Sequence, residues 1–319
     1  MTSAQWAEVA DLVRQVRWSV AHVRGVETGS GFFLAPADGD LALVTNAHVV
    51  DDEAIIVTYG DETVRSDRVT RAPQVDLAIA RFAREQFETV PEGLELRPLH
   101  DVGLGEPVIA IGSAYGMEGT VTSGVIAGLD RLRDRRQDPD GALLENCIVT
   151  DALIGEGNSG GPLLGLDGRV VGVTVARHTE LRVGSPSGFS YAIPASTVGL
   201  LLHDLRAGHD GLRRGKLGIR TEMREPTPSE RRLFGFVDGD RAVVAVEDPL
   251  PGEPSHGLVR RGDLLLELDG ERLTYAGQLL ALLDAERSTR ACRLVIARGG
   301  RRLPVIDIVP QPLGRPPSG

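Results

Sequence analysis

The sequence predicts a mainly β protein built from two domains. Short β-branched runs, punctuated by Gly, Asp and Pro, follow one another from Gly29 to about Pro194 without intervening helices. Many short strands at near-regular spacing are typical of antiparallel barrels or of a sandwich. A second set of strand-like runs occupies residues 216–310. The chain has 319 residues, which is enough for about two domains, each with its own core.

An amphipathic helix is expected at the start of the chain. Over residues 4–23 valines recur at alternating spacings of four and three, which places them on one face of a helix. These valines are Val9, Val13, Val16, Val20 and Val23. Valine is a weak helix former because it is branched at Cβ. Trp6 and Trp18 either extend this face or contact another subunit, and we favour packing within the same domain.

The first domain is predicted from strand-like runs that lie between residues 29 and 177. The runs are GSGFFLAP, LALVTNAHVV, AIIVTYG, VDLAIARF, PVIAIG, VTSGVIAG, CIVTDAL and RVVGVTVAR. A hairpin is expected to turn at Asp167–Gly168, because Asp-Gly between apolar runs is a strong hairpin signal. The polar stretch 129–146 is interpreted as a long exposed loop.

The domain boundaries follow from the next segments. Residues 195–207 predict a helix that ends near Gly208, where glycine can adopt the left-handed cap. A polar, Gly-rich linker follows, and the final residues resemble a disordered tail. We therefore expect four parts: an N-terminal helical segment (1–24), a first domain (25–210), a second domain (211–311) and a disordered tail (312–319).

Composition excludes several classes of function. The formal net charge is −10, and an acidic surface repels a phosphate backbone, so we expect no nucleic-acid partner. The two cysteines lie far apart and form no C-x-x-C pair. This pattern argues against a zinc site and against a disulfide framework.

The same inspection addresses location. The first residues lack the basic segment followed by an apolar segment that a signal peptide has. No run approaches the roughly 18 apolar residues of a membrane span. We therefore expect a cytoplasmic protein with no membrane partner, and note that an exported protein trimmed of its leader has the same features.

Residues 155–163, GEGNSGGPL, are the strongest chemical signal in the chain. A phosphate-binding loop needs a helix after it and usually a Lys-Ser/Thr pair, whereas Pro162 and a strand-like run follow here. A nucleophilic serine needs an exposed hydroxyl on a tight turn, with backbone N–H groups aimed at the developing oxyanion. Glycines at 157, 160 and 161 allow such a turn and a close approach of substrate. We therefore interpret Ser159 as a nucleophile.

Such a serine requires a histidine base and a carboxylate that orients the base. His48 lies at the end of the apolar run LALVTNAHVV, unlike the other histidines, which lie in polar or helical contexts. Asp76 opens the apolar run DLAIARF, where a charge without a partner is costly. Each residue alone is more often structural. Together they follow the order His, Asp, Ser, which is one of the chain orders of this triad.

Several motifs resemble the trypsin-like HtrA/Deg serine proteases. They are GSGFFL, TNAHVV, DLAIA, GEPVIAIG, TVTSGVIAG and TDALIGEGNSGGPLL. The resemblance spans roughly residues 9–200 and implies two six-stranded β-barrels with the triad in the cleft between them. It assigns His48 and Asp76 to the first barrel and Ser159 to the second.

The resemblance also implies a role for each residue. Ser159 attacks the scissile carbonyl, His48 accepts and returns the proton, and Asp76 fixes the imidazole tautomer. The backbone N–H groups of Gly157 and Ser159 form the oxyanion hole. No metal or cofactor is implied.

The resemblance also implies which residues line the substrate pocket. In trypsin-like folds the residue six positions before the nucleophile, here Leu153, lies at the pocket base. Phe189, Ser190 and Tyr191 match the segment that forms one pocket wall. Because Leu153 cannot pair with a buried cation, we expect a small apolar pocket that accepts Val, Ala, Ile or Leu.

The second domain resembles the PDZ domain that follows HtrA proteases. The resemblance rests on GKLGI at 215–219 and PSHGLVRRGDLLLELDG at 254–270. In such domains the C-terminus of a peptide adds as a strand, and backbone N–H groups hold its carboxylate. The residues that match the holding loop are Lys216, Leu217, Gly218 and Ile219.

The sequence thus predicts a serine endopeptidase that hydrolyses unfolded or damaged polypeptides. Its PDZ domain is expected to bind C-terminal peptides and to target or regulate cleavage. The alternative is a peptide-binding chaperone or scaffold with little proteolysis. The resemblance to this family also leads us to expect a homotrimer.

Overall fold

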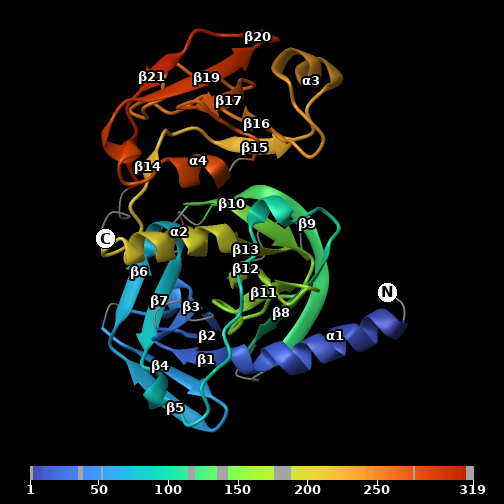
Figure 1. The fold of residues 1–319 in the computed structure, drawn as a ribbon, viewed down its shortest axis with the longest axis vertical. Helices are drawn as coiled ribbons and strands as arrows, with labels where there is room; N and C mark the ends of the chain where they lie inside the picture. The colour runs from blue at the N-terminus through green and yellow to red at the C-terminus, as the bar shows by residue number, and fades with distance from the viewer. Residues whose placement is uncertain are drawn as a thin grey trace. The chain divides into compact units, whose positions relative to one another are not determined.

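The computed structural model describes residues 3–34, 39–51, 53–113, 119–134, 143–175, 188–275 and 277–313. The chain divides into two compact units, residues 1–211 and residues 212–314 (Figure 1). Antiparallel strands dominate both units. The prediction of a mainly β protein is therefore confirmed.

The helix at the start of the chain is shorter than predicted. α1 spans Ser3–Val16, and its Leu12 and Val16 lie against Gly168. Residues Val20–Arg24 form strand β1, which pairs with β2 and β4. Arg17–Ser19 continue as a short 3₁₀ helix, and the helical prediction is wrong from Val20, because Cβ-branched valines that suit one helix face also suit a half-buried strand. Pairing with two neighbouring strands decides between these structures.

Seven strands form the first sheet, in the order β5-β4-β1-β2-β3-β7-β6. They are β1 (Val20–Arg24), β2 (Thr28–Leu34), β3 (Leu41–Thr45), β4 (Ile55–Tyr59), β5 (Glu62–Ser66), β6 (Val69–Ala72) and β7 (Leu77–Phe82). Only Asp67 and Arg68 separate the two edge strands, so the sheet is rolled and its edges meet. At this seam the Ser66 hydroxyl donates to the Arg81 carbonyl (2.6 Å). The predicted first barrel is thus a rolled sheet in which β5 and β6 together take the place of one strand.

Aromatic rings fill the first barrel. Phe33 packs edge-on against Tyr59, Phe82 and Phe87, with ring centroids 5.8, 6.2 and 5.5 Å apart. Such edge-to-face pairs add to the stability gained from burying apolar area. Because Phe82 belongs to β7, this core anchors the strand that follows Asp76.

Six strands close the second barrel, in the order β10-β13-β12-β11-β8-β9. They are β8 (Pro107–Gly112), β9 (Thr120–Asp134), β10 (Leu143–Thr150), β11 (Pro162–Gly165), β12 (Val170–Val175) and β13 (Ser190–Pro194). β11 and β12 form the predicted hairpin, with Gly168 at φ +77°. Residues 129–134 and 143–146, expected to be loop, belong to β9 and β10, because Asp134 pairs with Leu143. Residues 135–142 lie outside the described residues.

One helix completes the first unit. α2 (Ala195–Arg206) follows β13 directly and packs beside β12 and β13. Gly208 adopts φ +85° just after the helix. The predicted helix and its glycine stop are both confirmed.

The second unit contains a sheet in the order β15-β16-β17-β19-β20, with β18 paired to β17 and β21 to β19. Its strands are β14 (Gly215–Lys216), β15 (Thr221–Arg224), β16 (Ala242–Ala245), β17 (Leu264–Leu268), β18 (Glu271–Arg272), β19 (Cys292–Arg298), β20 (Arg301–Arg302), β21 (Ile306–Ile308) and β22 (Gln311–Pro312). Among the described residues, β15 pairs with β16 alone, so one long edge of this sheet is open. β22 pairs with β14, so the expected tail begins inside a strand at Pro312. Residues 314–319 lie outside the described residues.

Two short helices accompany this sheet. α3 (Pro228–Phe234) begins with a capping box, in which the Thr227 hydroxyl accepts from the Glu230 N–H. α4 (Gly277–Leu282) is shorter than the helix expected from AGQLLALLDAE.

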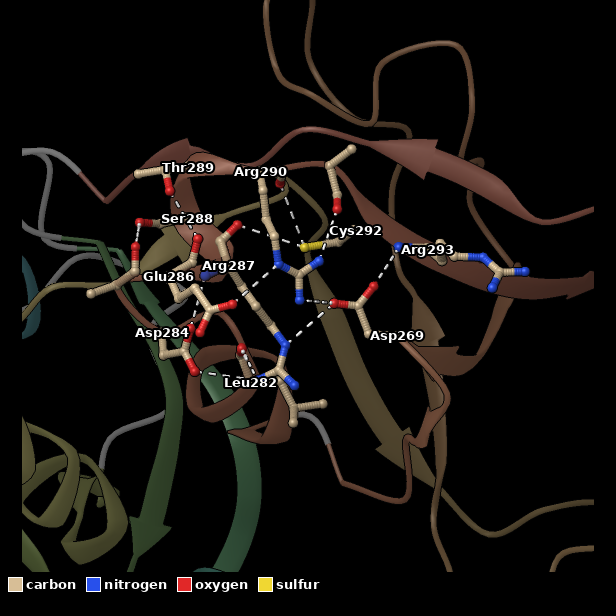
Figure 2. A network of polar contacts seen from close by, with 12 residues as sticks. Asp269, Leu282, Asp284, Glu286, Arg287, Ser288, Thr289, Arg290, Cys292 and Arg293 are labelled. Carbon is tan, nitrogen blue, oxygen red and sulfur yellow. Dashed lines mark hydrogen bonds and ion pairs between the residues drawn. The ribbon is translucent and has the colours of Figure 1, made fainter.

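Asp269 lies at the centre of a network of polar contacts in the second unit (Figure 2). It occupies the tight turn between β17 and β18 at φ +52°. Its carboxylate accepts from the Arg293 N–H (2.7 Å) and from the Arg290 and Arg287 guanidiniums (2.8 and 3.3 Å). Burial raises the pKa of Asp269, but these hydrogen bonds outweigh it and leave the pKa below its usual value. The turn is therefore tied to β19 and to the segment before it.

Candidate active site

His48 and Asp76 form a buried pair in the first unit. The Nδ1 atom of His48 lies 2.9 Å from both carboxylate oxygens of Asp76. The His48 backbone N–H donates to the same carboxylate at 3.1 Å. Their side chains are only 5% and 2% exposed. Because Asp76 accepts at Nδ1, the imidazole carries its proton there and leaves Nε2 as the basic nitrogen.

The backbone around Asp76 aims this carboxylate. Asp76 follows the 3₁₀ turn Pro73–Val75 and precedes β7, and it adopts the left-handed conformation with φ +51°. Non-glycine residues adopt this region at a cost, so local hydrogen bonds must hold it. The fully buried Asn46 supplies one, because its Nδ2 donates to the Asp76 carbonyl at 2.9 Å.

His48 is held from the opposite side of its turn. It lies in the 3₁₀ turn Ala47–Val49 that follows β3. The Arg71 guanidinium donates to the Ala47 carbonyl through Nε (3.1 Å) and Nη2 (3.0 Å). The turn that carries the imidazole is therefore fixed by a side chain from β6.

The turn that carries Ser159 packs against β2 and the end of β3. The Ser30 N–H donates to the Ser159 carbonyl at 2.7 Å. A Cβ atom at Gly160 would overlap the Ser30 carbonyl and the Thr45 hydroxyl, and would lie 3.0 Å from Asn46 N. Only glycine permits this approach. The structure thus places the serine turn beside Thr45 and Asn46, the residues that lead into the His48 turn.

Gly157 lies in a closed turn just before Ser159. The Asn158 N–H donates to the Gly155 carbonyl (3.1 Å), and Gly157 adopts φ +92°. A positive φ at the third residue of a turn is the mark of type II, which glycine favours. The Gly157 N–H makes no hydrogen bond to any residue that the structure describes. This donor is therefore available to an oxyanion.

The residues expected to line a substrate pocket are only partly brought together. Ser190 is buried in β13, and its hydroxyl accepts from the Ile154 N–H at 3.3 Å. This contact places the segment 189–191 beside the end of the Leu153–Ile154 segment. The Leu153 side chain, however, is 74% exposed, whereas Ile154 is buried. The expected base at Leu153 is therefore not formed, because the backbone turns that side chain towards solvent and the next one inward.

In the second unit the predicted holding loop follows β14. Leu217 and Ile219 are buried in the apolar core, and Gly218 adopts φ +71°. The N–H groups of Leu217, Gly218 and Ile219 donate to none of the residues that the structure describes. Lys216 Nζ lies 2.9 Å from Glu253 Oε1. Of the four residues expected together from sequence, Lys216 ends β14, and the next three form a loop whose N–H groups donate to no described residue.

Glu253 was not expected at this loop. Its Oε2 atom is buried without a hydrogen-bond partner among the described residues. A Cβ atom at Gly218 would overlap the Glu253 side chain. A carboxylate of the chain itself therefore lies against the loop that would hold the carboxylate of a peptide.

Sequence reasoning also missed three buried polar residues at the first site, Ser30, Thr45 and Asn46. Each lies within a motif that was singled out, GSGFFL or LALVTNAHVV. A polar residue in an otherwise apolar run could have indicated them, because a buried polar group needs a hydrogen-bond partner. The sequence does not show which residue that partner is, because it comes from a distant part of the chain.

The described residues contain no cluster of three or more His, Cys, Asp or Glu side chains arranged to hold a metal ion. No helix among the described residues is long and apolar enough to cross a bilayer.

Comparisons with known proteins agree with this geometry. The family model of the trypsin-like peptidase domain matches residues 29–173. The serine protease HhoA of Synechocystis sp. is 30% identical over 86% of this chain and 68% of its own length. The Do-like serine protease HtrA of Lactococcus lactis is 31% identical over 77% of this chain and 61% of its own length.

DegP-like relatives extend the comparison and correct one prediction. The DegP-like serine endoprotease of Halomonas elongata is 33% identical over 76% of this chain. The chain spans about half the length of such relatives, 48% for this one and 46% for that of Rickettsia prowazekii. These relatives are named periplasmic proteins. That finding overturns the expectation of a cytoplasmic location.

Solved structures match over nearly the whole chain. The HtrA-type protease AlgW with a tripeptide has a TM-score of 0.63 and 24% identity, and the match covers 97% of this chain and 98% of that one. The serine endoprotease of Yersinia pestis has a TM-score of 0.56 and 23% identity. At this level of identity the match shows the fold.

Proposed function

Because the chain belongs to the HtrA family of trypsin-like serine proteases, we propose that it is a serine endopeptidase. The observation that carries this proposal is the buried His48–Asp76 pair, with Nδ1 2.9 Å from both carboxylate oxygens, next to the segment against which the Ser159 turn packs. A buried carboxylate that accepts from a histidine ring is the arrangement that activates a neighbouring hydroxyl.

The proposed mechanism follows from the direction of each group. Asp76 holds the proton on Nδ1, so Nε2 of His48 accepts the Ser159 hydroxyl proton as the oxygen attacks the scissile carbonyl. His48 then returns the proton to the leaving amine, and Asp76 stabilises the imidazolium in between. The N–H groups of Gly157 and Ser159 bind the oxyanion, which costs little reorganisation when the turn is already closed. Water hydrolyses the acyl-enzyme through the same groups.

The proposed substrates are unfolded or damaged polypeptides. A protease cleaves an extended segment, and unfolded chains offer many such segments. Small apolar side chains are expected at the residue before the scissile bond, with Phe189, Ser190 and Tyr191 on one side. The Ile154 backbone N–H lies beside this wall through its hydrogen bond to Ser190, while the Ile154 side chain packs in the apolar core of the second barrel.

We propose that the second unit is a PDZ domain that binds C-terminal peptides and targets or regulates cleavage. Two observations support this. The loop Lys216–Ile219 presents N–H groups that donate to no described residue, and β15 has an open edge to which a peptide strand can add. Ile219 shares an apolar cluster with Leu279 of α4 and Met223 of β15. An apolar C-terminal side chain therefore fits beside them.

Assembly and location are part of the same proposal. Trp6 and Trp18 are 50% and 48% exposed, which favours an interface between copies, such as a homotrimer. The periplasmic relatives support work outside the cytoplasm.

The test uses one disulfide-bonded protein in two forms, native and reduced with its thiols blocked. The wild-type chain should degrade the unfolded form and leave the native form intact, and the Ser159→Ala variant should degrade neither form.

The alternative, a chaperone or scaffold, is favoured if the wild-type chain and the Ser159→Ala variant both bind the unfolded form and neither of them cleaves it.

A further inference from the structure

Ser30 in β2 is a fully buried residue that links several parts of the candidate active site. We propose that Ser30 is a positioning residue that holds the oxyanion turn at Gly157 in its closed form. This inference rests on the proposed peptidase function. The residue acts through Gly157 and has no direct contact with substrate in this account.

The Ser30 hydroxyl uses both of its hydrogen-bonding capacities. It donates to the Gly157 carbonyl at 2.7 Å, across 127 positions of sequence. It accepts from the Ser113 N–H at 2.9 Å. Both partners are buried, so the loss of this oxygen would leave a backbone carbonyl and an N–H without their hydrogen bonds.

The backbone of Ser30 is fixed at the same time. Its N–H donates to the Ser159 carbonyl (2.7 Å), and its carbonyl accepts from the Thr45 hydroxyl (2.7 Å). Thr45 lies three residues before His48. One residue of the first barrel therefore contacts the nucleophile, the oxyanion turn and the strand that leads to the base.

Glycines let the second barrel approach Ser30 closely. A Cβ atom at Gly112 would lie 2.8 Å from the Ser30 hydroxyl, and one at Gly161 would lie 3.3 Å from Ser30 Cβ. At Gly160 it would overlap the Ser30 carbonyl. Three glycines from two segments of the second barrel thus surround one serine, and no larger residue fits at these positions without a shift of the surrounding atoms.

The Gly157 turn needs such a support. Gly155 and Gly157 flank Glu156, and glycines have the largest range of backbone conformations. The turn is closed by the hydrogen bond from Asn158 to Gly155, and Thr174 holds the Asn158 carbonyl at 2.5 Å. The Ser30 hydroxyl restrains Gly157 itself. Without it, the Gly157–Asn158 peptide keeps only the hydrogen bond from Asn158 to Gly155. The turn is then looser, and the adjoining Glu156–Gly157 peptide, which carries the Gly157 N–H, can rotate away from the oxyanion.

Ser30→Ala tests this role, and Ser66→Ala is a matched control. The buried Ser66 hydroxyl also donates to a backbone carbonyl, Arg81 O (2.6 Å), and accepts from a backbone N–H, Arg68 N (3.1 Å), but at the seam of the first sheet. Both substitutions remove one oxygen and two hydrogen bonds. Only the first is expected to change catalysis.

The readouts are kcat and KM for a short peptide, and the affinity for a peptide boronate that places an oxygen in the oxyanion hole. Ser30→Ala should lower kcat by about 10- to 100-fold, less than or similar to the loss of an oxyanion donor. It should weaken boronate binding by a similar factor and leave KM little changed. Ser66→Ala should stay within about twofold of the wild type in all three.

Equal kcat values for the two folded variants would overturn the inference while the wild type remains an active peptidase. A wild type with no peptidase activity would overturn the proposed function and this inference with it. If Ser30→Ala fails to fold, Ser30→Cys keeps a group at the Oγ position, a slightly larger thiol that hydrogen-bonds weakly. A folded Ser30→Cys variant with wild-type kcat and boronate affinity would also contradict the role.

Discussion

The Gly157 turn and the Gly218 loop are both built round a glycine at positive φ, but they are stabilised in opposite ways. Buried hydroxyls of Ser30 and Thr174 bind the backbone of the first turn. The N–H groups of the Gly218 loop donate to no described residue, and beside it lies a partly exposed ion pair, with Lys216 38% and Glu253 24% exposed. We therefore expect the first site to be assembled in advance and the second to be completed by its ligand.

The difference predicts how sensitive each site is to substitution. A buried hydrogen bond is costly to lose because its partner stays desolvated. An exposed ion pair contributes little, since water and salt replace it. Changes at the first site should therefore have large effects on catalysis, and changes at the second should have modest effects on binding.

The largest effect is expected for Ser159→Ala. Without the nucleophile, kcat for a short peptide should fall by about 10⁴-fold or more, because nucleophile, base and orienting carboxylate act as a unit. The thermal unfolding curve should change little, since one oxygen is lost at the end of a turn. The measurement is hydrolysis at high enzyme concentration beside a melting curve. More than a few per cent of wild-type activity would exclude the triad.

Gly218→Ala should break the loop of the second unit. A Cβ atom there meets Glu253 and also forces alanine into the left-handed region. Affinity for a peptide with an apolar C-terminus should fall by about tenfold or more, as strain of a few kcal/mol implies. Gly257→Ala is the control, because Gly257 has φ +76° but open space at its Cβ position. Equal losses for both variants would mean that the loop is not the binding site.

Glu253→Gln should have a smaller effect than Gly218→Ala, and it should raise the affinity of the loop for a peptide and not lower it. The Glu253 carboxylate lies against the loop, so it competes with and repels the carboxylate of a peptide. Its removal should tighten binding of a free C-terminus by about three- to fivefold, the scale of a partly exposed charge pair. A C-terminally amidated peptide should show no such gain in fluorescence anisotropy titrations. Weaker binding of the free acid would show that Glu253 helps to hold the loop.

The smallest effect concerns the ion pair at α3. Hydrogen bonds from the Arg224 guanidinium, with help from Thr227, lower the pKa of Glu230 from 4.5 to about 2 despite partial burial. Because the folded pKa lies below the unfolded one, Glu230 stabilises the unit above about pH 4.5, and this contribution is lost as the pH falls towards 2.

Between about pH 5 and pH 4, hydrogen-exchange protection of residues 228–234 should fall by about threefold after correction for intrinsic rates. Glu230→Gln cannot titrate and should show a flat profile over the same interval. A wild-type profile as flat as that of the variant would contradict the pKa shift.

The sequence identified the residues whose chemistry is unusual for their surroundings. His48 and Asp76 stood out as polar groups in apolar runs, and they are partners. Ser159 stood out through its glycines, which do permit the close approach of β2. Such residues can be recognised from sequence because a charged group that is buried needs a partner in any fold.

Other features depended on contacts that no local pattern encodes. Val20 and Val23 suit a helix face and a strand equally, and pairing with β2 and β4 decided between them. β5 and β6 are largely polar segments whose order comes from the seam of the rolled sheet. The role proposed for Ser30 depends on a contact across 127 positions.

Some misses were avoidable, and one arose from the backbone path. Thr227 and Glu230 form a capping box, and the sequence TPSE has the pattern that is typical of one. The start of α3 could therefore have been predicted. Leu153 was assigned to a pocket by its distance from Ser159 in the sequence, yet its side chain is exposed. Position along a chain does not give the direction of a side chain when the intervening turn contains glycines.

The most direct test of the account is fluorophosphonate labelling of the full chain at rest, with no peptide added. The probe reacts with a serine activated by a base and stabilises an oxyanion-like adduct, so it requires both the His48–Asp76 pair and the closed Gly157 turn. Mass spectrometry should locate a near-complete adduct on Ser159 alone, absent from Ser159→Ala. No adduct, or an adduct spread over other serines, would contradict a nucleophile assembled in advance.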